Sequence, residues 1–290
     1  MVIRLISWFA ENARPLPWRE PNVTAWGILV SEVMLQQTPV ARVEPMWHAW
    51  MRRWPTPGDL ASASTAEVLE AWGRLGYPRR ALRLHQAAHR IATEYDGQVP
   101  SDAALLRALP GIGEYTAAAI QSFAFGMPAL VLDINIRRVL GRVFGGVERV
   151  SSSITHTDRQ WAARAFDEAH RHPSWNAAIM EFGALICTSR SPACGECPIA
   201  DRCKWRLAGY PPSELTPRTQ AWEGTDRQAR GIIIDFLRHS PSFAGNVDEL
   251  RRLWPDASQL SRAIASLTHD GLIHSPESDV YYLGSAQHIE

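Results

Sequence analysis

All four cysteines of the chain lie within one short segment, at Cys187, Cys194, Cys197 and Cys203. A chain of 290 residues, 46% of them hydrophobic, has enough apolar material for a core and does not need these thiols as disulfide staples. The spacing C-x6-C-x2-C-x5-C contains one C-x2-C pair, whereas a usual zinc ribbon contains two. The pattern favours a [4Fe–4S] cluster, with structural zinc and free or redox-active thiols as the alternatives.

Glu32 lies in the stretch WGILVSEVMLQQTPV, residues 26–40, and is a candidate for acid catalysis. On a helix its neighbours one turn away include Ile28, Leu29 and Leu35, so its carboxyl lies on a mostly apolar face. A buried, unpaired carboxyl holds its proton, and a general acid needs that property. The alternative is an ordinary helix glutamate whose carboxylate reaches solvent.

Asp133 follows an apolar run in ALVLDINIRRVL and precedes a predicted helix. Its carboxylate is therefore placed to cap backbone N–H groups, an environment that favours the ionised form. One carboxyl that keeps a proton and another that keeps a charge form the pair that glycoside cleavage uses, because its transition state resembles an oxocarbenium ion. A plain helix cap is the alternative, and it is compatible with the catalytic role.

The stretch LRALPGIGEYTAAAI, residues 106–120, has the pattern of two helices joined by a tight hairpin. One helix is predicted to end at Leu109 and the next to begin at Glu114, with Gly111 and Gly113 between them. These glycines allow close approach of the backbone, and the start of the second helix offers N–H groups to a phosphate. The pattern indicates a helix-hairpin-helix that grips the DNA backbone without reading its sequence.

The elements that position these residues are predicted to be helical throughout the part before the cysteines. Ser64 and Glu67 form a capping-box signature, and apolar residues recur at helical spacing in TAEVLEAWGRLG, RRALRLHQAAHRIATEY and HTDRQWAARAFDEAH. The tryptophans are expected to pack in the core and not to stack on bases. A Pro-rich linker follows at 209–217, and beyond it three helices and a β-hairpin predict a small winged helix.

Charge and targeting signals indicate what kind of DNA-binding protein this is and where in the cell it works. The formal net charge is zero, which argues against a globally basic DNA-binding protein, but arginines cluster at two places. These clusters are Arg79, Arg80 and Arg83, and Arg137, Arg138 and Arg142. The sequence shows no signal peptide and no apolar run of the ~18 residues that a membrane span needs, so we expect a cytoplasmic protein with no membrane partner.

The motifs LPWR, SEVMLQQT, LGY, LPGIGEYTA, LDINIRRVL and MEFGALIC, followed by the cysteines, occur in this order. Together they resemble the A/G-specific adenine DNA glycosylases (MutY type) of the endonuclease III-like helix-hairpin-helix superfamily, over roughly residues 5–210. The resemblance implies an all-α, two-lobed fold and a [4Fe–4S] cluster that shapes a DNA-binding loop. It also implies a monomer that flips and excises adenine opposite 8-oxoguanine or guanine in duplex DNA.

The resemblance assigns roles to individual residues. It makes Glu32 the acid that protonates adenine and Asp133 the carboxylate that stabilises the sugar cation, with Asn135 and Tyr115 beside the reaction centre. The adenine pocket would be formed by Leu16, Trp18, Arg19 and Glu181. Gln37 would enter the base stack and Tyr77 would act as a wedge, while Gly111, Gly113 and Arg206 would contact the DNA backbone. Pro78 departs from the family pattern, which has a second aromatic residue there.

The expected domains are a glycosylase core over 1–208 that includes the iron–sulfur loop 187–203, a linker over 209–225 and a winged-helix-like module over 226–290. That module is too short for the lesion-reading domain typical of the family.

Two other functions stay open at this point. An endonuclease III-type glycosylase/lyase on damaged pyrimidines needs a lysine nucleophile at position 115, but the one lysine is Lys204. A non-catalytic iron–sulfur DNA-binding regulator would not need Glu32 on an apolar face.

Overall fold

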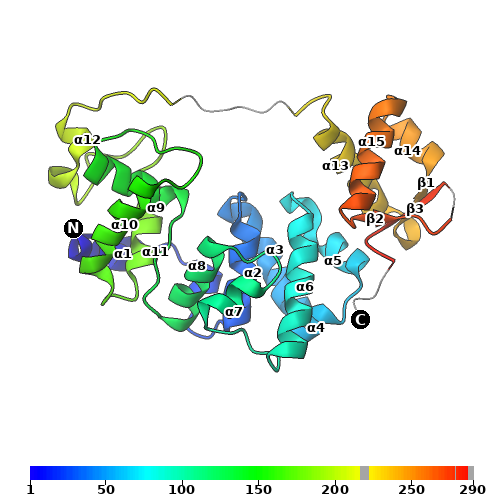
Figure 1. The fold of residues 1–290 in the computed structure, drawn as a ribbon, viewed down its shortest axis with the longest axis horizontal. Helices are drawn as coiled ribbons and strands as arrows, with labels where there is room; N and C mark the ends of the chain where they lie inside the picture. Colours follow the sequence, from blue (N-terminus) through cyan, green and yellow to red (C-terminus); the bar gives the residue numbers. More distant parts are fainter. Residues whose placement is uncertain (216–221, 278, 287–290) are drawn as a thin grey trace. The chain divides into compact units, whose positions relative to one another are not determined.

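The computed structural model describes residues 1–215, 222–277 and 279–286. Its ribbon is helical from α1 to α12, and short strands follow α13 (Figure 1). The predicted, mostly helical fold is therefore confirmed. Residues 216–221 of the linker predicted over 209–225 lie outside the described residues. None of the helices in the described part of the chain combines the length and the apolar character that crossing a membrane requires.

Contacts divide the chain into two compact units. The first comprises Met1–Ile28, Ser101–Arg107 and Ile112–Arg218, and the second comprises Leu29–Pro100, Ala108–Gly111 and Thr219–Glu290. The helices α2 (Ala25–Leu35) and α7 (Ala103–Ala108) each begin in the first unit and end in the second. The C-terminal module thus belongs to the same compact unit as residues 29–100, and the linear division into core, linker and module stays a prediction.

The first unit is built on packed helices around one apolar core. Its other helices are α1 (Val2–Asn12), α8 (Glu114–Phe125), α9 (Ile134–Leu140), α10 (His156–Ala169), α11 (Trp175–Leu185) and α12 (Lys204–Leu207). Helix α11 packs against both α1 and α9, and α9 packs against α10. Leu5, Val139 and Phe182 are buried where these helices meet. This core fixes the start of α9, where Asp133 lies.

Before the C-terminal module, the second unit contains the helices α3 (Val40–Arg53), α4 (Pro57–Ala61), α5 (Thr65–Trp72) and α6 (Arg79–Glu94). The Ser64 capping box is confirmed, because its hydroxyl accepts from the Glu67 N–H at 3.2 Å and the Glu67 carboxylate accepts from the Ser64 N–H at 2.9 Å. The expectation that the tryptophans pack in the core is confirmed for Trp26, Trp47, Trp50, Trp54 and Trp72, but it is wrong for Trp222, which is 49% exposed. Trp50 is buried and makes edge contacts with Trp54 and Trp72, at centroid distances of 4.9 and 5.5 Å.

The C-terminal module contains the three predicted helices, α13 (Asp226–His239), α14 (Val247–Leu253) and α15 (Ala257–His269). The predicted hairpin is formed by β2 (Ile273–His274) and β3 (Val280–Leu283). A third strand, β1 (Ala244–Asn246), pairs antiparallel with β3, so the sheet order is β1-β3-β2. Strand β1 was not predicted from the sequence, since three residues with a central glycine carry no alternating pattern.

The module is tied to the helices of its own unit by polar contacts. Arg74 binds Asp235 at 2.9 Å, and Arg238 donates from Nε to the carbonyl of Leu69 at 3.1 Å. At the end of the sheet, the Ser285 N–H donates to the Thr65 hydroxyl at 3.0 Å. These contacts come from α13 and from the segment after β3, so the module meets α5 and the turn after it through two of its faces.

Candidate active site and metal centre

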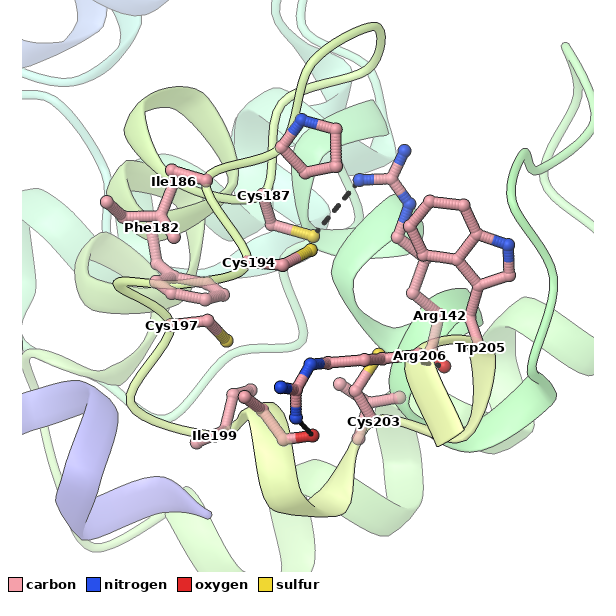
Figure 2. A pocket seen from close by; sticks show the side chains of 14 residues that line it. Arg142, Phe182, Ile186, Cys187, Cys194, Cys197, Ile199, Cys203, Trp205 and Arg206 are labelled. Carbon is pink, nitrogen blue, oxygen red and sulfur yellow. Dashed lines mark hydrogen bonds between the residues drawn. The ribbon is translucent and has the colours of Figure 1, made fainter. Parts of the chain in front are cut away.

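The four cysteines line a single pocket of the first unit (Figure 2). All four thiols are free of disulfides, and their side chains point into the same space. Apolar side chains complete the wall, among them Phe182, Ile186 and Ile199. Burial raises the pKa of the Cys197 thiol to about 11, so metal binding must displace a proton there.

Arg142 holds the segment that carries the first cysteine. Its Nη1 donates to the sulfur of Cys187 at 3.3 Å (Figure 2). The same atom donates to the carbonyl of Thr188 at 2.7 Å. Its guanidinium also lies 4.5 Å from the centroid of Trp205 and is 1% exposed. A cluster with four thiolate ligands is anionic, and an apolar pocket with a buried cation and an N–H donor at the sulfur suits it. The residues present therefore fit an iron–sulfur cluster.

The second arginine cluster is not a DNA-binding surface, which corrects the sequence analysis. Arg137, Arg138 and Arg142 are 4%, 8% and 1% exposed. Arg137 pairs with buried Asp158 at 2.9 Å, and the other two bind backbone carbonyls of the cysteine segment. Their spacing in sequence reflects a helix that faces the interior. By contrast, Arg79 and Arg83 of the first cluster are exposed.

Asp133 caps α9, as predicted. One carboxylate oxygen accepts from the N–H of Ile136 at 2.6 Å, and the other accepts from Nδ2 of Asn135 at 2.6 Å. Desolvation nevertheless raises the pKa of Asp133, and the hydrogen bonds only partly offset that effect. The expectation that its surroundings favour the ionised form is therefore wrong, because dipoles replace less solvation than burial removes.

A chain of hydrogen bonds joins the cysteine pocket to Asp133. Arg138 donates from Nε to the carbonyl of Cys187 at 2.8 Å and from Nη2 to Oδ1 of Asn135 at 2.9 Å. The other end of the Asn135 amide holds Asp133. Buried Arg138 and partly buried Asn135 thus connect a cluster ligand with the candidate catalytic carboxylate. Asn135 lies beside Asp133, and its place at the reaction centre stays a prediction.

Glu181 forms a buried ion network with arginines near the N-terminus. Its carboxylate is 1% exposed and accepts from the backbone N–H, Nε and Nη2 of Arg14 at 2.7 to 3.0 Å, and from Nη2 of Arg19 at 3.0 Å. Burial alone would raise the pKa of Glu181, but these bonds lower it to about 2. Trp18 is buried in the short helix Pro17–Arg19, and Leu16, the N-cap of that helix, is buried too.

Arg14 is the residue that sequence reasoning missed. It makes more bonds to Glu181 than Arg19 does, although 167 residues separate the two in sequence. A signal for this pairing was present in the sequence. Arg14 and Arg19 flank the LPW motif, and a buried glutamate needs cationic partners.

Glu32 lies in the second unit and is 5% exposed, which confirms its predicted burial. It stands on α2, where Leu29, Val33 and Met34 are buried around it in sequence. Asp133, Asn135, Tyr115 and the Glu181 network belong to the first unit. Tyr115, on α8, is partly buried against that unit's core.

Gln37 and Tyr77 share an unusual backbone. Their φ angles are +56° and +48°, in the left-handed region that side chains rarely adopt. One guanidinium holds both loops: Arg80 donates from Nη1 to the carbonyls of Val33, Met34 and Gln36, and from Nη2 to Thr38, Leu75 and Gly76. Burial lowers the pKa of Arg80 to about 10, so it stays charged at neutral pH. Strain held in this way is typical of a functional loop.

The predicted hairpin between α7 and α8 is present. Gly111 has φ +80°, and a Cβ there would lie 2.9 Å from Cβ of Arg83, so this position needs glycine. Gly113 is the N-cap of α8 and has an extended backbone. Arg206 is exposed beside the cysteine pocket, with Lys204 exposed at the start of the same helix.

Comparison with known proteins decides the family. The model of the HhH-GPD superfamily base excision DNA repair proteins matches residues 30–162, and that of the iron–sulfur binding domain of endonuclease III matches residues 187–203. The adenine DNA glycosylase of Mycolicibacterium smegmatis is 49% identical over 272 residues, which cover 93% of this chain and 92% of the relative. The chain belongs to the adenine DNA glycosylase family.

Other relatives agree with this assignment. The human adenine DNA glycosylase is 41% identical over 70% of this chain and 38% of its own length. The structure of a thermostable thymine-DNA glycosylase matches with a TM-score of 0.64 and 25% identity, over 71% of this chain and 95% of that one. A non-covalent endonuclease III–DNA complex has the same fold, with a TM-score of 0.58 at 22% identity, over 72% of this chain and 94% of that one.

This adenine DNA glycosylase is thus a hydrolase of N-glycosyl bonds that acts on DNA in base excision repair. Its four cysteines hold a [4Fe–4S] cluster, which sets aside structural zinc. The non-catalytic regulator is set aside as well. Because the M. smegmatis alignment leaves at most 7% of the chain unmatched, it includes most of the C-terminal module, 226–290.

Proposed function

We propose that this glycosylase removes adenine mispaired with 8-oxoguanine or guanine, after turning the adenine out of the duplex. The observation that carries the proposal is the environment of Glu32, a carboxyl 5% exposed among apolar residues of α2. Such a side chain is suited to donate a proton to a base. Protonated adenine leaves as a neutral molecule when the bond between C1′ and the base breaks, and water then completes an abasic site.

Asp133 offsets the positive charge that develops on the sugar. Its raised pKa means that the carboxylate is poorly solvated before the reaction. A cation that develops beside it supplies the missing compensation, so the interaction is stronger in the transition state than in the ground state. Asn135 orients Asp133 through the bond of 2.6 Å, and Tyr115 lies on the helix that follows the hairpin.

Binding and extrusion of the base are assigned to further residues. Leu16, Trp18, Arg19 and Glu181 hold the adenine, and the network of Glu181 fixes the guanidinium of Arg19. Gln37 and Tyr77 fill the space that the adenine leaves, which offsets a cost of ~a few kcal/mol for unstacking. Gly111, Gly113 and Arg206 contact phosphates. The cluster, when bound, closes the loop 187–203 and takes no part in bond breaking.

A panel of duplexes tests the proposal. Single-turnover assays should show adenine release opposite 8-oxoguanine and opposite guanine, with an undamaged A·T duplex as the control. The DNA strand should stay intact until alkali is added, because Tyr115 cannot form the Schiff base that a lyase needs. Release of oxidised pyrimidines with strand cleavage would support the lyase alternative instead. We expect one chain to act as a monomer, which sedimentation of the DNA complex would check.

A further inference from the structure

A broad groove of the second unit lies between the two strained loops and α13. Gln37 and Tyr77 line it on the side of the helices, and Trp222 and Arg227 line it on the side of the C-terminal module. Every lining residue belongs to this one unit. The matched family models end at residues 162 and 203, so neither includes Trp222 or Arg227.

Arginines dominate the lining of this groove. They are Arg42, Arg74, Arg79, Arg80, Arg83, Arg227, Arg230 and Arg238, against the acids Asp235 and Glu249. Asp235 binds two of them, and Asp270 binds Arg79 at 3.2 Å and Arg230 at 2.6 Å. Guanidiniums still outnumber the three carboxylates. An anionic ligand is therefore favoured, and a duplex-binding enzyme supplies one in the DNA backbone.

Aromatic rings are interleaved with these cations. The Arg227 guanidinium lies 5.4 Å from the centroid of Tyr77 and 5.3 Å from that of Trp222, and its Nη2 lies 3.3 Å from the Tyr77 hydroxyl. Tyr77 is 46% exposed and Trp222 is 49% exposed. Exposed aromatic faces beside arginine are surfaces on which unstacked bases lie. This chemistry fits a nucleotide better than an acidic protein segment.

The β-hairpin of the module takes no part in this surface. Among the described residues that line the groove, none belongs to β2 or β3. The segment after β3 instead meets α5, through Ser285 and Thr65. The module lines the groove through α13, the turn that follows it, Ala244 of β1 and two residues of α14, and Trp222 lies just before the module.

We infer that the groove binds the strand opposite the adenine, and that Arg227 distinguishes 8-oxoguanine from guanine there. This inference rests on the proposed function. Extrusion of the adenine leaves its partner base unpaired, with the polar edge exposed. Trp222 and Tyr77 contact the face of that base, and the Arg227 guanidinium donates to O8, an acceptor that 8-oxoguanine carries and guanine lacks. The module thus supplies the reader of the lesion through α13.

Arg227→Gln in the full-length protein tests the inference, with Arg251→Gln as the matched control. Arg251 lies in the same module, outside the groove, and its side chain is 61% exposed. The first readout is the ratio of single-turnover adenine release opposite 8-oxoguanine and opposite guanine. The second is the Kd, over a range of salt, for the same duplexes with 2′-fluoro-2′-deoxyadenosine. That nucleotide resists excision because fluorine destabilises the sugar cation.

We expect Arg227→Gln to lower the preference for 8-oxoguanine about tenfold, in rate and in Kd, as loss of one directional base contact does. Arg251→Gln should leave both unchanged. Trp222→Ala should weaken both complexes alike, because stacking does not depend on base identity.

An unchanged preference in Arg227→Gln overturns the inference. Equal weakening of both duplexes, with a salt slope lower by about one, would make Arg227 a phosphate contact and overturn it too. If the wild-type protein releases no adenine, the proposed function fails, and the Kd values alone decide the role of the groove.

Discussion

Two carboxyls of the first unit, Glu181 and Asp133, are both desolvated, but their pKa values shift in opposite directions. Burial raises the pKa of each, but in Glu181 the bonds from Arg14 and Arg19 outweigh it and bring the pKa to about 2. Asp133 receives hydrogen bonds from a backbone N–H and an amide, and its pKa stays raised. Arg138, nearby, binds the Asn135 oxygen. Full cations compensate a buried charge, whereas dipoles leave part of it uncompensated.

This difference in charge compensation distinguishes Glu181, which holds arginines in place, from Asp133, which we propose takes part in the reaction. Glu181 already has cations around both oxygens, so a further positive charge gains little from it. Asp133 is held in place with its charge only partly compensated, and a sugar cation would lower its energy. We infer that Glu181 serves the adenine pocket by positioning Arg19, and that Asp133, whose charge is less compensated, is the carboxyl that faces the sugar cation.

The largest effect expected from this comparison is that of Asp133→Asn. Excision should fall about 10²–10³-fold, as loss of one electrostatic contact in a transition state does. Stability at neutral pH should hold or rise, because asparagine also caps helices and carries no charge to desolvate. A raised folded pKa contributes stability below the unfolded value, near 3.8, and loses it as pH rises, so the advantage of the variant should shrink on acidification. Melting temperatures across pH check this; a less stable variant that keeps its rate would reduce Asp133 to a cap.

Glu181→Gln should act in the reverse sense. Since the folded pKa is about 2 and the usual value is 4.5, the carboxylate contributes about 3 kcal/mol above pH 4.5, and this is lost as pH falls toward 2. The variant should therefore be less stable than the wild type at pH 7, with a smaller difference at pH 3.5. Denaturant unfolding measures it, with exposed Glu168→Gln as the control. The same deficit at both pH values would contradict the assignment.

A smaller effect is expected from the link between the cluster and Asp133. Arg138→Lys should slow excision about tenfold without loss of iron, because an ammonium cannot hold Asn135 and the carbonyls of Cys187 and Gly183 with the same geometry. Arg137→Lys, one residue away and paired with Asp158, is the control. It should lower the melting temperature but not the rate per cluster-loaded molecule. Equal rates in both variants would show that the chain of bonds carries no function.

The smallest effect concerns the second unit. Arg80→Lys should weaken binding to a mispaired duplex several-fold with little change in the rate of the bound complex, because the loops of Gln37 and Tyr77 lose a shared support. Arg53→Lys, on an exposed face of the same unit, serves as the control. A change in rate at saturating enzyme, with unchanged affinity, would place Arg80 in the chemistry and not in DNA binding.

Local patterns in the sequence predicted the features that depend on neighbouring residues. The capping box at Ser64, the cap at Asp133, the hairpin glycines and the cysteine spacing each lie within a few turns of chain, and the structure has all of them. The burial of Glu32 followed from helical spacing.

Features that depend on distant residues were missed. Spacing places Arg137, Arg138 and Arg142 near each other, but their burial depends on distant partners. Arg138 and Arg142 bind the cysteine segment, about 45 residues further along, and Arg137 binds Asp158. The same holds for Arg14 with Glu181 and for Tyr77 with Arg227, 150 residues apart. The direction of the Asp133 pKa required knowledge of its burial, which no short pattern contains.

Single-turnover release of adenine opposite 8-oxoguanine by Glu32→Gln, beside the wild type, tests the central claim most directly. Iron content and DNA affinity should be measured on the same samples. We predict rapid release by the wild type, and a loss of about 10²–10⁴-fold in the variant with unchanged affinity and iron, because the amide has no proton to donate. Near-normal release by a cluster-loaded Glu32→Gln protein would contradict the two-carboxyl mechanism.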